Sequence, residues 1–120
     1  MQFEVVIQLL FYFPRKFEFV VYFLSMIQWK TIKLKRLAHA LLSLKTEREM
    51  LAFLRDAATL EELDELGTRW DVVLELNKGK SYRDIAKKTG VSTATVTRIA
   101  HWFRHGEGGY QAALKKIKQG

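Results

Sequence analysis

The chain has 120 residues, 48% of them apolar and 28% charged, which suffices for one hydrophobic core and one domain. It has no cysteine, which excludes disulfides and thiolate chemistry and is compatible with the cytoplasm, where we expect the protein to act. The net charge of +7 is unevenly distributed, because residues 46–77 carry three basic against nine acidic side chains and residues 78–120 carry ten against two. A basic segment of this kind is typical of a phosphate-binding surface.

Residues 1–29 differ from the rest of the chain and hold six of its eight phenylalanines. Two apolar runs, 5–13 and 17–24, flank Pro14, and each is shorter than the roughly 18 to 20 residues that span a bilayer. We expect neither a transmembrane helix nor a secretory signal, and a membrane-associated role would depend on this segment alone. Its composition predicts two short strands or an apolar helical arm. Alternatively, Met26 is the natural start of the protein.

Three helices are predicted between Lys30 and Gly79 from apolar residues at helical spacing. The first covers about 33–43. The second opens on a capping box of Thr46 and Glu49 and ends near Ala57, and the third opens on a second box, Thr59 with Glu62, and stops at Gly79. The apolar stripe of the third helix comprises Leu60, Leu63, Leu66, Trp70, Val73, Leu74 and Leu76. Within it, Gly67 predicts a close approach or a bend.

Residues 81–104, SYRDIAKKTGVSTATVTRIAHWFR, have the spacing of a helix-turn-helix. Ser81 is a good N-cap, with Asp84 where a capping-box acid stands, Gly90 suits a left-handed turn, and Ser92 can cap the second helix. The residues of that helix predicted to face inward are Val96, Ile99 and Ala100, and those predicted to face outward are Thr93, Ala94, Thr95, Thr97 and Arg98. A plain helical hairpin would also use these caps, but it would explain the exposed threonines less well.

The outward groups suit the major groove, because methyls meet thymine methyls and hydroxyls or arginine reach base edges. The residues predicted to contact bases are Thr93, Ala94, Thr97 and Arg98. Those predicted to contact phosphates are Tyr82, Arg83, Lys87, Lys88 and Arg104. After this motif, the glycines at 106, 108 and 109 predict a flexible hinge, and Tyr110, Ala113, Leu114 and Ile117 predict a short final helix.

Three segments together carry a family resemblance: LLSLKTEREMLAFLRDAATLEELDELGTRW, SYRDIAKKTGVSTATVTRIAHWF and GEGGYQAAL. Over about residues 44–116 the chain resembles the Trp repressor-like family, and most closely its small YerC/YecD-type branch. The resemblance implies an all-α bundle, an intertwined homodimer and one helix-turn-helix per subunit. We therefore expect residues 30–120 to form a DNA-binding domain after a 1–29 extension, and the protein to be a repressor-like regulator that binds specific double-stranded DNA. The leucine-rich helices before the motif independently favour a dimer.

The resemblance also implies a place for an effector. In tryptophan-binding members a threonine and two arginines help to enclose the ligand, and Thr59, Arg69 and Arg98 match those positions. These members have a glycine next, where this chain has Ile99, and an overpacked pocket costs about 1 to 3 kcal/mol. We therefore expect that free tryptophan is not the corepressor, and we expect no cofactor.

Two other functional classes share part of this sequence pattern. A helix-turn-helix component of transposase-type mobile-element machinery would share the motif but would depend on a separate catalytic chain. An enzyme is not expected. His101 and His105 are four residues apart, as in some metal pairs, but no third ligand is evident nearby in the sequence, so we expect no metal site.

Overall fold

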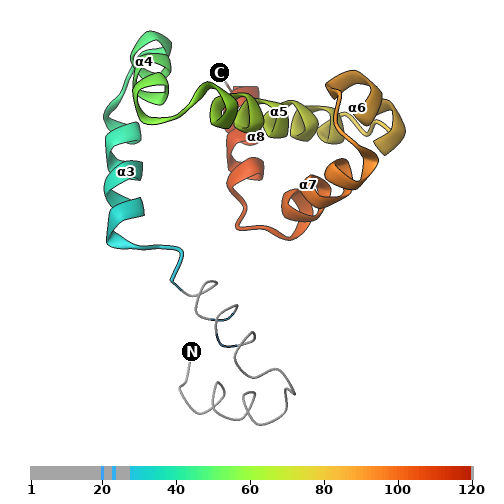
Figure 1. Cartoon of the computed structure of the whole chain (residues 1–120), viewed down its shortest axis with the longest axis horizontal. Coiled ribbons are helices and arrows are strands. Elements are labelled where there is room, and N and C mark those ends of the chain that lie inside the picture. Colours follow the sequence, from blue (N-terminus) through green and yellow to red (C-terminus); the bar gives the residue numbers. More distant parts are fainter. Residues whose placement is uncertain (1–19, 21–22, 24–27, 120) are drawn as a thin grey trace. The chain divides into compact units, whose positions relative to one another are not determined.

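The computed structural model describes Val20, Phe23 and residues 28–119, and among these it contains helices and no strands (Figure 1). The helices are α3 (Ile32–Ser43), α4 (Glu47–Ala57), α5 (Leu60–Asn77), α6 (Tyr82–Thr89), α7 (Thr93–His105) and α8 (Gly109–Gln119). The predicted all-α fold is confirmed. Most of the 1–29 extension, with its expected strands or arm, lies outside the described residues, so its boundary stays a prediction. No helix in the described part is long and apolar enough to cross a membrane.

The chain divides into two units, Met1–Phe53 and Leu54–Gly120. The first unit contains α3 and the start of α4, and neither helix buries a residue in the single chain. Ile32 and Leu42 of α3 are 70% and 80% exposed. The predicted apolar stripe of this segment therefore forms a helix, and none of its side chains is buried among the described residues.

Hydroxyl side chains begin most of these helices. The Thr59 hydroxyl accepts from the Glu62 N–H at 3.2 Å while the Glu62 carboxylate accepts from the Thr59 N–H at 2.8 Å, so the predicted capping box is complete. The box predicted at Thr46 is only half formed. Thr46 accepts from the Glu49 N–H at 3.1 Å, but the Glu49 carboxylate accepts from the N–H of Lys45 at 3.0 Å, one residue earlier than expected.

The hydrophobic core lies in the second unit, where α5, α6, α7 and α8 contribute buried side chains. These are Val72, Val73, Leu76, Ile85, Val96, Ile99, Ala100 and Leu114. Only the C-terminal part of the predicted α5 stripe enters this core, because Leu60 and Leu66 are more than half exposed. Val72, which was not part of the predicted stripe, is fully buried instead.

Gly67 has no close neighbour in the chain, since a Cβ there would meet nothing within 4 Å. The described residues of the second unit therefore show no close approach at this position. The glycines after α7 form a defined turn, in contrast to the predicted hinge. Gly106 donates its N–H to the Trp102 carbonyl at 2.9 Å, a Cβ on Gly106 would collide with that oxygen, and Gly109 already belongs to α8.

Candidate nucleic-acid interface

The helix-turn-helix forms at the predicted residues. Ser81 accepts from the Asp84 N–H at 3.1 Å and Ser92 from the Thr95 N–H at 3.1 Å, so each hydroxyl begins one of the two helices. Gly90 ends α6 with φ of 77°, a left-handed conformation that costs a side chain about 1 to 2 kcal/mol. Ile85 and Val96 are buried between the helices and α5, so this core sets the orientation of α7.

The inward and outward sides of α7 are largely as predicted. Val96, Ile99 and Ala100 are buried, whereas Thr93, Ala94, Thr97 and Arg98 are exposed on the N-terminal half of the helix. Thr95 differs from the prediction, because it is half-buried and its hydroxyl lies 3.0 Å from that of Ser92. The exposed set is the one assigned to base contacts. Whether it contacts bases is not tested by this arrangement.

The hydroxyl of Thr97 donates to the Thr93 carbonyl at 2.9 Å. In this arrangement its proton is engaged, so the oxygen can accept from a base amino group while the methyl group remains available to thymine. The Arg98 guanidinium lies 3.4 Å from the Thr95 hydroxyl, which is a long contact that leaves most of its N–H groups unengaged.

Arg104 at the end of α7 is joined to Tyr82 at the start of α6. Its Nη1 donates to the Tyr82 hydroxyl at 2.6 Å, and the guanidinium carbon lies 5.8 Å from the centre of the tyrosine ring. The pair closes the helix-turn-helix across 22 residues of sequence. The hydroxyl proton of Tyr82 and the remaining N–H groups of Arg104 stay available as hydrogen-bond donors. Because the two side chains are in contact, a single phosphate could accept from both.

The three cations of α6 fall into two kinds. Arg83 and Lys87 are exposed, and neither has an ion-pair partner among the described residues. Lys88 instead donates to Glu75 of α5 at 2.7 Å, and Lys78 donates to the same carboxylate oxygen at 2.9 Å. Lys88 was predicted to contact phosphate with the others, but its ammonium group is already engaged within the chain.

Glu75 is the shared partner of the two lysines, and the sequence pattern did not single it out. Its side chain is only 9% exposed, although it belongs to the strongly acidic segment 46–77. Hydrogen bonds from Lys88 and then Lys78 lower the pKa of Glu75 from its ordinary value of 4.5 to about 2. Its position offered a signal, because Glu75 lies between Val72 and Leu76 on the buried side of α5.

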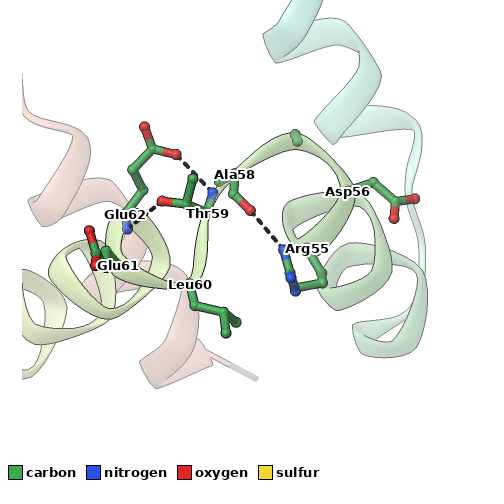
Figure 2. A pocket seen from close by; sticks show the side chains of 8 residues that line it. Arg55, Asp56, Ala58, Thr59, Leu60, Glu61 and Glu62 are labelled. Carbon is green, nitrogen blue, oxygen red and sulfur yellow. Dashed lines mark hydrogen bonds between the residues drawn. The ribbon is translucent and has the colours of Figure 1, made fainter.

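An open pocket of about 650 Å³ lies at the corner between α4 and α5. Figure 2 shows its lining of residues 55–62, in which Thr59 and Glu62 form the capping box and Arg55 donates to the Ala58 carbonyl at 3.2 Å. The polar groups that line this pocket are therefore largely engaged in holding the corner itself.

The residues assigned to an effector pocket each have a different environment. Thr59 caps α5, Arg69 lies 4.0 Å from exposed Glu65, and Arg98 contacts Thr95. Ile99 is buried among the core residues of α5, α6 and α7. Their assignment to a ligand stays a prediction.

The two histidines of α7 lie side by side, with ring centres 5.2 Å apart. Among the described residues no group of three or more histidine, cysteine, aspartate or glutamate side chains is placed to hold a metal ion. The His101 ring also stands edge-on to the exposed ring of Trp102, with the two ring centres 6.1 Å apart. These residues form a surface cluster and give no indication of chemistry.

Comparison with known proteins decides the family. The family model described as Trp repressor protein matches residues 32–118, which include every helix from α3 to α7 and most of α8. The chain belongs to the Trp repressor family. The Trp repressor-family chain is 34% identical over 87 residues to the uncharacterized protein YerC of Bacillus subtilis (strain 168), covering 72% of this chain and 84% of YerC.

A solved structure supports the same assignment. The crystal structure of a TrpR like protein from Eubacterium eligens ATCC 27750 matches with a TM-score of 0.71 and 35% identity, covering 76% of this chain and 94% of that chain. The Trp repressor-like fold and the predicted YerC-type relationship are therefore confirmed. Membership in this family indicates a helix-turn-helix DNA-binding regulator.

Proposed function

We propose that this Trp repressor-family chain is a repressor-like transcriptional regulator that binds specific sites in double-stranded DNA. The observation that carries the proposal is the two-sided α7. Its buried residues fix the helix on the core, and its exposed N-terminal half presents only short side chains and Arg98. Short groups allow close entry into the major groove, where a helix distinguishes all four base pairs.

The phosphate contacts in this proposal come from α6 and the end of α7. Arg83 and Lys87 supply exposed positive charge, and the Tyr82–Arg104 pair supplies two donors held together at 2.6 Å. Contacts of this kind set position and make affinity fall with salt, whereas the α7 residues give sequence preference. The basic segment 78–120 supports this division of roles.

The regulator acts as a homodimer in this proposal. The apolar side chains of α3 and α4 support it, because neither helix buries a residue within one chain and exposed leucines of this number would favour aggregation. A second copy that covers them would present two helix-turn-helix motifs to two half-sites, about one helical turn of DNA apart.

DNA binding is independent of tryptophan in this proposal. Ile99 is a core residue with 7% exposure, so its side chain fills space that glycine would leave open. Titration calorimetry of the protein with free tryptophan should show no micromolar binding. Saturable micromolar binding that tightens the affinity for DNA would contradict this part of the proposal.

Selection of bound duplexes from a random-sequence library with the full chain tests the function. Enrichment of a two-fold-symmetric site is the expected result, because two identical recognition helices contact two half-sites. A selection that converges on no sequence would contradict specific DNA binding, and a single asymmetric half-site would contradict the dimer.

A further inference from the structure

The ammonium groups of two lysines bind the same carboxylate oxygen, that of Glu75, where α5 packs against α6 of the helix-turn-helix. Lys88 comes from the last turn of α6 and lies 2.7 Å from Glu75 Oε1, and Lys78 comes from the end of α5 and lies 2.9 Å from the same atom. The lysine side chains are 64% and 56% exposed, whereas the Glu75 side chain is 9% exposed. The carboxylate is therefore fixed, and the two cations reach it from the surface.

This arrangement distinguishes Lys88 from its neighbour Lys87. Both lysines stand in α6 and both are exposed, but only Lys88 has an acidic partner among the described residues. Lys88 makes the shorter of the two hydrogen bonds to this nearly buried carboxylate, 2.7 Å against 2.9 Å for Lys78, so its departure would leave the charge of Glu75 with one partner at the longer distance. Lys88 is thus held by α5 under conditions in which Lys87 can contact a phosphate.

We propose that Glu75 restrains DNA binding by retaining Lys88, so that this lysine couples α6 to α5 and does not contact the phosphate backbone. The inference rests on the proposed DNA-binding function and adds Glu75 as a residue that limits the affinity for DNA. Removal of the carboxylate would leave two ammonium groups close together without a counter-ion. Such a pair repels itself and attracts phosphate, so the variant would bind duplex DNA more tightly and with a steeper salt dependence.

The test measures the affinity of the full-length protein for one duplex at several salt concentrations, for wild type and five variants. Lys88→Gln should leave the slope of log affinity against log salt unchanged. Lys87→Gln, the matched change on the same helix, should make that slope shallower by about 0.9 per subunit, the value for one lost phosphate contact. Glu75→Gln should make it steeper by at least about 0.9 per subunit, and adding Lys88→Gln to it should reduce that gain.

Glu65→Gln removes an equal charge from an exposed position of α5 and measures the general effect of lost negative charge. Helicity and unfolding temperature, measured for every variant, identify those that fold. Lys88→Gln leaves Glu75 paired with Lys78, so it keeps the proposal testable if Glu75→Gln does not fold.

A shallower slope for Lys88→Gln, equal to that of Lys87→Gln, would overturn the inference and leave the proposed function intact. An equal rise in affinity for Glu75→Gln and Glu65→Gln would overturn it as well. Absence of salt-dependent duplex binding by the wild-type protein would overturn the proposed function itself.

Discussion

At the scale of single residues, partners decide which charges are available to a ligand. Lys87 and Lys88 are adjacent and chemically identical, but Lys88 shares a carboxylate oxygen with Lys78. Likewise, Arg104 is oriented by the Tyr82 hydroxyl, whereas Arg83 is exposed without an ion-pair partner among the described residues. The residue type alone cannot distinguish these cases. A lysine paired with a buried carboxylate and a lysine free to bind a phosphate carry the same ammonium group.

Thr97 and Arg83 should respond differently to substitution. Thr97→Ala should weaken binding to a preferred duplex by about 1 to 3 kcal/mol while leaving random duplex almost unaffected, because it removes a base-facing hydroxyl. Arg83→Gln should weaken both duplexes about equally, because phosphates are the same in every sequence. Fluorescence anisotropy gives, for each duplex, the ratio of the variant's dissociation constant to that of the wild type. Equal losses on both duplexes for Thr97→Ala would contradict the assigned roles.

Glu75 should make the stability of the second unit sensitive to acid. Its folded-state pKa of about 2 lies below the ordinary 4.5, so the folded state favours the charged form. This contribution is therefore complete above pH 4.5 and is lost as the pH falls from about 4.5 to about 2. Urea unfolding at a series of pH values should show a weaker acid dependence for Glu75→Gln than for wild type. Glu65→Gln is the control, and identical acid dependence in all three proteins would refute the assignment.

At the scale of helices, spacing and capping in the sequence located every element from α3 to α8 closely. Local rules sufficed there because an N-cap, a glycine in a left-handed turn and an apolar stripe depend on near neighbours. The partner of each stripe was harder to predict. In α5 the pattern treated Leu60 and Val73 alike, yet Leu60 is exposed and Val73 is fully buried in one chain.

The ion pair of Glu75 was unpredictable for a related reason. It joins α5 to α6 across 13 residues, so it exists only once both helices pack together. The exposed side of α7, in contrast, followed from the spacing of apolar residues in one helix. Sequence therefore predicted which residues of the candidate site are exposed where a single helix decides it, and not where two helices share a contact.

Two glycines provide a test of backbone conformation at this scale. Gly90→Ala places a side chain at φ of 77° and should destabilise the protein by about 1 to 2 kcal/mol. Gly67→Ala, within α5 and without a neighbour inside 4 Å, should stabilise that helix by about 0.5 to 1 kcal/mol. Urea unfolding of both variants measures the difference. Destabilisation by Gly67→Ala at concentrations where the protein is monomeric would contradict the finding that a Cβ at position 67 meets no other atom.

At the scale of the whole chain, charge and apolar surface are segregated. The segment that contains the helix-turn-helix carries ten basic against two acidic side chains, and the preceding segment 46–77 is acidic apart from three basic residues. Most of the large apolar side chains that are exposed among the described residues lie in α3, α4 and the first half of α5, and the others are Trp29, Trp102 and Ile117. One end of the sequence therefore suits a second copy of the chain, and the other suits a polyanion.

Affinity for duplex DNA at several salt concentrations tests this account most directly. The full chain should bind its selected site about a thousandfold or more tighter than a scrambled duplex of equal length. Affinity for both duplexes should fall as salt rises, since both offer the same phosphates. Equal affinity for the two duplexes, or no salt-dependent binding to either, would contradict the claim that α7 is a DNA recognition helix.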